Sequence, residues 1–175
     1  SPGPLTCAGF TASYQHERHD AMQYAAWGVD YLKYDWCSYG TIEKERTVAA
    51  LQKPYRVMRS ALNAVDRDIV YSLCQYGMGS VWEWGGEVGG NCWRTTGDIE
   101  DTWESMTGIG FAQNGHEKHA KPGNWNDPDM LVVGKVGWGP QLHPTRLTPN
   151  EQYTHITLWS LLSSPLLIGC DMTQM

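Results

Sequence analysis

The stretch YLKYDWC, Tyr31 to Cys37, has the pattern of a buried strand, yet it also carries a lysine, an aspartate and a cysteine. Successive side chains of a strand point to opposite faces, so Lys33 and Asp35 share one face with Tyr31. The other face carries the apolar side chains of Leu32, Tyr34 and Trp36. An ordinary surface strand with one salt bridge would show the same pattern, so the neighbouring segments decide whether these charges are structural or functional.

Helical and strand-like segments alternate along the chain. Apolar residues at helical spacing predict helices at residues 17–27, 47–65 and 102–114. A fourth helix is predicted after Thr148, because Pro149 and Glu151 complete a capping box. Strands are predicted in the segments VDYLKYDW, DIVYSLC, CWRTTGDI, NDPDMLVV and PLLIG. Such alternation predicts a parallel sheet in an α/β fold.

Polar residues gather at the carboxyl ends of the predicted strands. They are Lys33 and Asp35, Gln75, Arg94 and Asp98, and Asn126, Asp127 and Asp129. In a parallel α/β barrel these ends meet on one face, where active sites are built. Carboxylates that lie near each other and near cations can be held in different protonation states, as cleavage of a glycosidic bond requires. A Gly- and Trp-rich loop at residues 75–91 is long enough to contribute to such a site.

Composition excludes several classes of partner. The chain has 175 residues, 41% of them hydrophobic, and a net charge of -6, so a phosphate backbone would be repelled and nucleic acid is not an expected partner. No apolar run approaches the roughly 20 residues of a membrane helix. The start, SPGPLTCAGF, has neither an initiator Met nor a signal pattern. Nine Trp and nine Tyr against two Phe give a weak indication of a sugar-binding surface.

The chain has five cysteines, so at least one of them stays unpaired within the chain. Their spacing allows Cys7 to bond Cys37 and Cys74 to bond Cys92, and such bridges would indicate an oxidising compartment. Reduced thiols in a cytosolic core are the alternative. No cysteine or histidine spacing supports a zinc site.

Five segments in order resemble glycoside hydrolase family 27, the retaining α-galactosidases and α-N-acetylgalactosaminidases. They are TCAGF, WGVDYLKYDWC, IVYSLCQYG, WRTTGDIEDTW and WNDPDMLVVG, and the resemblance covers essentially the whole chain. It implies that residues 1–175 form part of one catalytic (β/α)8 barrel, roughly strands 4 to 8, with the N-terminal strands and any C-terminal β-domain absent. Because closure of such a barrel takes eight strands, we expect this chain not to be the whole catalytic unit.

The resemblance also implies roles for individual residues. Asp35 is the expected nucleophile and Asp98 the expected general acid/base. The residues expected to bind the substrate are Lys33, Cys74, Gln75, Trp84, Arg94, Asp129 and Met130. The family pairing implies the disulfides Cys7–Cys37 and Cys74–Cys92, and no cofactor or metal is expected.

The expected function is that of a retaining exo-glycosidase that removes terminal α-D-galactosyl residues by double displacement. The substrate is an α-galactoside oligosaccharide or glycoconjugate, and the compartment is secreted, periplasmic or lysosomal. An α-N-acetylgalactosaminidase, a β-L-arabinopyranosidase, a sugar-binding barrel without turnover and a metal hydrolase are the alternatives. The oligomeric state is left open.

Structural roles compete with these assignments at several positions. Asp98 could simply be an acid at a helix N-terminus, where the helix dipole favours it. Trp82 and Trp84 could be core residues or a sugar platform. His16 and His19 stand three apart as metal ligands can, but no third ligand lies nearby in the sequence.

Overall fold

The computed structural model describes residues 1–137 and 141–174, and the chain divides after Arg94 into two compact units. In the first unit three parallel strands alternate with helices, which confirms the predicted α/β character. The number of barrel strands that the chain supplies stays a prediction. Among the described residues, none of the helices has both the length and the apolar character needed to span a bilayer.

The first unit is built on a parallel sheet. Its strands are β1 (Tyr31–Asp35), β2 (Val70–Cys74) and β3 (Cys92–Arg94). Asp35 lies opposite Cys74 in the β1–β2 pair, and Ser72 lies opposite Cys92 in the β2–β3 pair. Partners in parallel strands point to the same face, so this register decides which side chains can meet.

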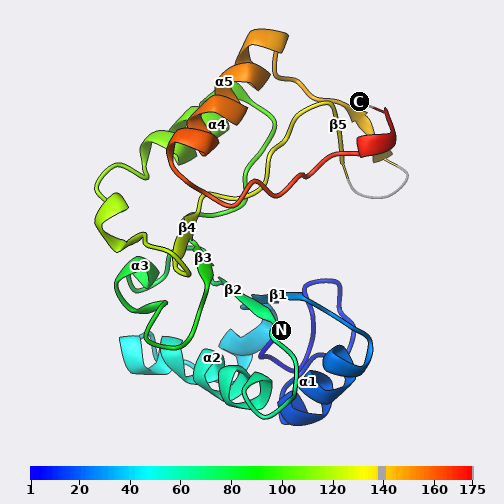
Figure 1. Cartoon of the computed structure of the whole chain (residues 1–175), viewed down its shortest axis with the longest axis vertical. Helices are drawn as coiled ribbons and strands as arrows, with labels where there is room; N and C mark the ends of the chain where they lie inside the picture. The colour runs from blue at the N-terminus through cyan, green and yellow to red at the C-terminus, as the bar shows by residue number, and fades with distance from the viewer. Residues whose placement is uncertain (138–140, 175) are drawn as a thin grey trace. The chain divides into compact units, whose positions relative to one another are not determined.

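Helices cover one face of this sheet. They are α1 (Glu17–Ala26), α2 (Val48–Leu62) and the short α3 (Val81–Trp84), with a 3-10 turn, η1 (Cys37–Thr41), after β1. Figure 1 shows α1 and α2 on the same side of the strands. The first turn of α2 is fixed by Thr47, whose side chain accepts a hydrogen bond from the Ala50 N–H. The predicted helices at 17–27 and 47–65 are confirmed, with slightly shorter bounds.

The core of the first unit is aromatic. Tyr34 of β1, Tyr71 of β2 and Tyr55 of α2 are all fully buried, and the Tyr34 ring centroid lies 6.1 Å from that of Tyr71 and 6.2 Å from that of Tyr55. Trp93 of β3 joins the same cluster. The predicted alternation along β1 is therefore confirmed, because the apolar face packs under the helices and the other face keeps Lys33 and Asp35.

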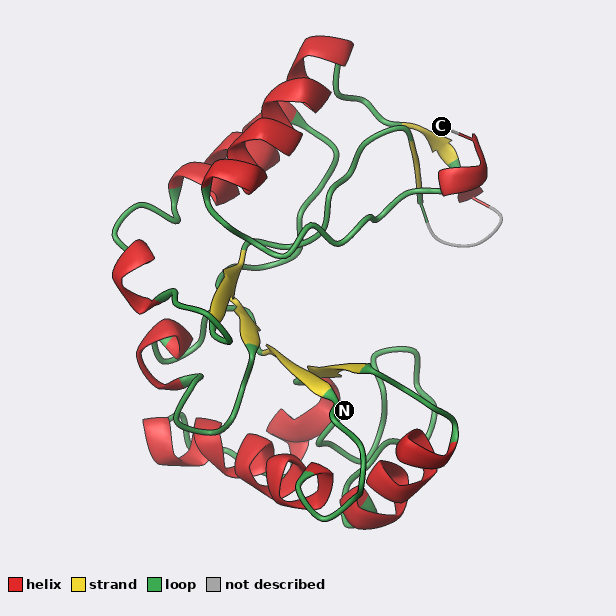
Figure 2. Ribbon diagram, in the orientation of Figure 1, coloured by secondary structure: helices red, strands yellow, loops and turns green. Residues whose placement is uncertain are grey.

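The second unit packs two longer helices together. Its elements are α4 (Trp103–Phe111), η2 (Glu117–His119), β4 (Trp125–Asp127), β5 (Lys135–Val136), β6 (His143–Pro144), α5 (Pro149–Leu161) and η4 (Met172–Gln174). Figure 2 shows α4 and α5 side by side. Gly110 permits this approach, because a Cβ there would collide with the side chain of Leu158. The predicted capping box of α5 is present, with Glu151 accepting from the Thr148 N–H.

Several predicted elements differ from the structure. The last predicted strand, PLLIG, forms only an isolated parallel bridge between Leu131 and Ile168. The loop at 75–91 contains α3, and the β5–β6 hairpin was not predicted. Two-residue strands and a four-residue helix are too short for a periodic pattern to appear in the sequence.

His155 of α5 is a buried histidine in the core of the second unit. Its side chain is fully buried, and its Nε2 accepts a hydrogen bond from the Val132 N–H at 3.1 Å. Burial lowers the pKa of His155 to about 4, because the imidazolium would lose its hydration. Only the neutral ring can accept this bond, so the packing of α5 on the chain at Val132 requires an uncharged histidine.

We expect acid to destabilise the protein through His155. Its pKa is about 6.5 in the unfolded chain and about 4 in the fold, so between these values only the unfolded state gains the proton. The stabilisation is complete above a pH of about 6.5 and is lost as the pH falls toward about 4, by at most about 3 kcal/mol. Denaturant unfolding at both ends of this window measures the loss.

The matched variant is His155→Gln, which keeps an acceptor but does not titrate, and the loss of stability in acid should be smaller in it. His19→Gln is the control, because His19 lies exposed on α1 and should leave the pH dependence unchanged. An acid sensitivity of the same size in His155→Gln and in the unmodified protein would contradict the assignment.

Candidate active site

A row of polar side chains crosses the carboxyl ends of the three strands of the first unit. Asp35 ends β1, Cys74 ends β2 opposite it, and Arg94 ends β3. The Arg94 Nη1 lies 3.9 Å from the Cys74 Sγ. The register thus brings together three of the residues predicted for the site. Lys33 lies one layer below, opposite Ser72.

The Asp35 carboxylate lies against the Cys7–Cys37 disulfide. A carboxylate oxygen of Asp35 and the two sulfur atoms are all within 4.8 Å of one another. The two sulfurs are bonded to each other and are not thiolates, so this group is not a candidate metal site. The Oδ1 of Asp35 is buried and accepts no hydrogen bond from any described residue. The carboxylate therefore borders the disulfide, and its Oδ1 can still accept a hydrogen bond.

Cys74 places a neutral thiol beside Asp35. Burial raises the pKa of Cys74, and the negative charge of Asp35 raises it further. The thiol consequently stays protonated, and a protonated thiol can donate to a carboxylate. Cys74 is thus a potential hydrogen-bond donor that lies opposite Asp35 in the β1–β2 pair.

The predicted Cys74–Cys92 disulfide is wrong for this structure, which joins only Cys7 to Cys37 among the described residues. The register explains why. Cys92 lies opposite Ser72 and not opposite Cys74, so the two cysteines are offset by two residues along neighbouring strands. That offset separates their Cα atoms by roughly 8 Å, whereas a disulfide needs less than about 7 Å.

Peptide mapping without reduction tests this cysteine chemistry. We expect Cys7 and Cys37 to appear in one linked pair of peptides, and the peptides with Cys74 and Cys92 to be alkylated separately after denaturation. In the native protein Cys74 should react slowly, because burial keeps it protonated. A linked pair of Cys74 and Cys92 peptides would show that the strand register is wrong.

Gln75 and Arg94 are polar side chains buried at the strand ends. Gln75 is fully buried, and neither of its amide atoms has a hydrogen-bond partner among the described residues. Leaving a buried polar group unsatisfied costs about 1–3 kcal/mol, which favours a partner from outside these residues. Arg94 is 1% exposed, and its guanidinium lies 5.9 Å from the Tyr76 ring centroid.

Trp84 belongs to the core, which corrects the expectation that it contacts sugar. It is 3% exposed in α3, its ring lies 6.2 Å from that of Tyr55, and its Nε1 donates to the Gly79 carbonyl at 2.8 Å. Protein therefore encloses both the ring and its polar atom. Trp82, at the same helix, is only partly buried.

In the second unit Asp98 is exposed on the loop between β3 and α4. Asp129 lies under this loop, because its Oδ2 accepts a hydrogen bond from the Ile99 N–H at 2.9 Å. The Asp129 Oδ1 accepts from the Met130 N–H, also at 2.9 Å, and the Trp159 Nε1 donates to the Asp129 carbonyl. The predicted contact of Asp129 with sugar stays a prediction, but the structure gives this residue a structural contact with the loop.

The backbone at Asp129 is strained. Its φ of 89° lies in the left-handed region that residues other than glycine avoid. Asp127 helps to hold this geometry, since its Oδ1 accepts from the Asp129 N–H at 2.8 Å. Asp127 is thus a hydrogen-bond acceptor within this loop. Met130 is half-buried against the small cluster of Val132 and Leu147, and its sugar contact is likewise a prediction.

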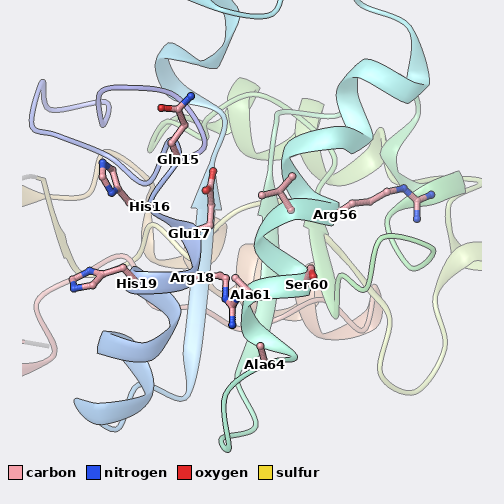
Figure 3. A pocket seen from close by; sticks show the side chains of 10 residues that line it. Gln15, His16, Glu17, Arg18, His19, Arg56, Ser60, Ala61 and Ala64 are labelled. Carbon is pink, nitrogen blue, oxygen red and sulfur yellow. The ribbon is translucent and has the colours of Figure 1, made fainter.

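A groove of about 910 Å³ between α1 and α2 is a further candidate for binding. Figure 3 shows that Arg56 points away from His16 and His19, so the polar groups do not converge on one ligand. None of the residues predicted for the site lines this groove. The residues predicted for the site lie at the strand ends and not in this groove.

Comparisons with known proteins agree with one another. A family model described as "Alpha galactosidase A" matches residues 1–175. Alpha-galactosidase 2 of Arabidopsis thaliana is 43% identical over 175 residues, which cover 99% of this chain and 40% of the relative. The chain therefore spans less than half the length of that curated relative.

Two solved structures are similar. The structure of alpha-galactosidase I from Mortierella vinacea matches with a TM-score of 0.84 and 33% identity, over 99% of this chain and 46% of that one. The structure of an alpha-galactosidase from Saccharomyces cerevisiae with raffinose matches with a TM-score of 0.78 and 30% identity, over 97% of this chain and 40% of that one.

Proposed function

This chain belongs to the alpha-galactosidase A family of glycoside hydrolases, and we propose that it supplies both catalytic carboxylates of a retaining α-galactosidase. The observation that carries the proposal is the row of Asp35, Cys74 and Arg94 across three parallel strand ends. This row sets a carboxylate beside a neutral donor and close to a fixed cation. A carboxylate in such surroundings is suited to act as a nucleophile.

The proposed reaction has two displacements. In the first, Asp35 attacks the anomeric carbon while the bond from that carbon to the leaving oxygen breaks, and Asp98 gives its proton to this oxygen. In the second, Asp98 takes a proton from water, the water oxygen attacks the anomeric carbon, and the bond to Asp35 breaks. Galactose leaves, and both carboxyl groups return to their starting protonation states.

The neighbouring residues support Asp35 as the nucleophile and Asp98 as the general acid/base. Arg94 and Lys33 are the cations expected around the sugar, and the Cys74 thiol can donate to the Asp35 carboxylate. Asp98 lies exposed on a loop, where water and a leaving group can reach it. The unsatisfied amide of Gln75 is a candidate for binding a sugar hydroxyl.

The substrate class follows from the relatives. One similar structure is that of an alpha-galactosidase with raffinose, which favours terminal α-galactosyl groups of oligosaccharides as substrates. The higher identity to an alpha-galactosidase of Arabidopsis thaliana, 43%, favours galactose over N-acetylgalactosamine and arabinopyranose at the site. The Cys7–Cys37 disulfide favours an oxidising compartment, whether secreted, periplasmic or lysosomal.

The chain is proposed to form part of one catalytic barrel. It spans 40% of the length of the Arabidopsis relative, and its parallel strands fit the later half of an eight-stranded barrel, roughly strands 4 to 8. Further strands would complete the sugar pocket. Activity therefore has to be measured on the protein that contains these 175 residues within its full reading frame.

Replacing the nucleophile tests the function. In that full-length protein, Asp35→Asn should lower hydrolysis of a nitrophenyl α-galactoside below detection, because a carboxamide is not a useful nucleophile. The fold should survive, since Asp35 is only half-buried and lies outside the aromatic core. Asp68→Asn, at an exposed aspartate before β2, is the control and should retain full activity. Normal turnover in Asp35→Asn would remove the assignment.

The stereochemistry of the product tests the two-step mechanism. Proton NMR of a fresh reaction should show α-galactose first and the β-anomer only after mutarotation. The same mechanism requires the carboxyl groups of Asp35 and Asp98 to lie about 5–5.5 Å apart in a crystal structure of the full-length protein. Initial release of β-galactose, together with a separation nearer 9 Å, would indicate inversion instead.

A further inference from the structure

We propose that Asp101, Arg146 and Asp129 are positioning residues that hold Asp98 in place for proton transfer. This inference rests on the proposed function, because it concerns the same general acid/base. We use the word clamp for the contacts that hold the loop from Ile99 to Asp101. These three residues make most of those contacts. In this proposal Asp101 and Arg146 do not touch the substrate, and all three residues act through the backbone that carries Asp98.

The clamp fixes each of the three residues that follow Asp98. The Ile99 N–H donates to the Asp129 carboxylate at 2.9 Å, and the Glu100 N–H donates to the Ser105 hydroxyl at 2.9 Å. The Asp101 side chain is held separately by Arg146. Three consecutive anchors leave the backbone next to Asp98 little freedom, although Asp98 itself is exposed.

The contact between Asp101 and Arg146 is the most extensive of these anchors. Two guanidinium nitrogens of Arg146 donate to the Asp101 Oδ1 at 2.9 and 2.7 Å, and the Arg146 backbone N–H donates to the Oδ2 at 2.8 Å. The Asp101 side chain is 8% exposed, whereas that of Arg146 is 58% exposed. The arginine can therefore lose this partner and stay hydrated, which makes Asp101 the safer residue to replace.

Asp101 stays ionised over the range in which a glycosidase works. Burial alone would raise its pKa, but the hydrogen bonds from the Arg146 side chain and backbone, together with the arginine charge, outweigh burial and hold the pKa below its usual value. The carboxylate thus keeps accepting all three hydrogen bonds at neutral and mildly acidic pH. Protonation of Asp101 does not release the loop under these conditions.

The backbone of Asp129, the residue that anchors Ile99 in the clamp, is strained. Asp129 has a φ of 89°, and the Asp127 carboxylate and the Trp159 indole both bond its backbone. Strain of this kind is kept where surrounding contacts over-determine a geometry, often at a functional site. Here the geometry aims the Asp129 carboxylate at the amide next to Asp98.

Proton transfer is sensitive to position, so loosening the clamp should impair Asp98 selectively. A misplacement of about 1 Å can cost roughly 100-fold in rate. A poor leaving group depends on protonation by the acid, whereas a nitrophenolate leaves without it. The ratio of the two rates therefore separates loss of positioning from general damage to the fold.

The experiment compares hydrolysis of methyl α-galactoside and nitrophenyl α-galactoside by the full-length protein and its variants. Asp101→Ala should lower kcat/KM for the methyl glycoside about 10- to 100-fold and for the nitrophenyl glycoside less than about threefold. Arg146→Met keeps the backbone hydrogen bond, so its effect should point in the same direction and be smaller.

Two control variants test whether the change in the rate ratio is specific to the clamp. Glu100→Gln changes an exposed side chain of the same loop whose carboxylate is 3.7 Å from Arg146, and the ratio should not move. Arg67→Met removes another arginine–aspartate pair, with Asp30, in the first unit and should also leave the ratio unchanged. Equal losses on both substrates in Asp101→Ala and Arg146→Met, or no loss in either, would overturn the proposal.

Amide hydrogen exchange tests the clamp without relying on activity. In Asp101→Ala the amides of residues 99–101 should exchange at least about tenfold faster, with no change in Glu100→Gln. Unchanged exchange would overturn the clamp. If the unmodified protein hydrolyses neither glycoside, the proposed function fails, and the exchange result still decides whether these residues hold the loop.

Discussion

The in-register parallel pairing of β1 with β2 is the constraint on which the rest of the site depends. It sets Asp35 opposite Cys74 and leaves the alternate residues, Tyr34 and Leu73, to pack beneath the helices. A slip of one residue would bury the charged face and expose the aromatic one. The same register therefore places the hydrophobic core on one face of the sheet and the candidate active-site residues on the other. Packing of the core thus holds the active-site residues in position.

The proposed nucleophile, Asp35, lies in a region that contains a disulfide, a thiol and a guanidinium. The Cys7–Cys37 disulfide joins the start of the chain to the turn after β1, next to the Asp35 carboxylate. On the neighbouring strand a buried and protonated Cys74 lies within 3.9 Å of Arg94. The disulfide borders the carboxylate, and the neutral thiol lies opposite Asp35 in the β1–β2 pair.

The longer elements and the strand-end residues could be predicted from the sequence. Period-two alternation in YLKYDW and the capping box at Thr148 are local signals, and the structure confirms both. The Cys74–Cys92 pairing and the sugar-facing role of Trp84 could not be predicted correctly, because they depend on strand register and on burial by α2. The Asp101–Arg146 contact joins residues 45 apart, and no local pattern reveals it.

The two proposed carboxylates differ in their supports: Asp35 ends a strand beside a disulfide, and Asp98 lies on a clamped loop. Asp35 is the residue proposed to form the covalent bond to the sugar. Treating the full-length protein with a fluorinated galactosyl fluoride, which slows breakdown of the intermediate, and sequencing the labelled peptide by mass spectrometry tests this directly. We expect the sugar on Asp35, in the peptide that contains KYDWC. A sugar on Asp98 or on another residue would contradict it.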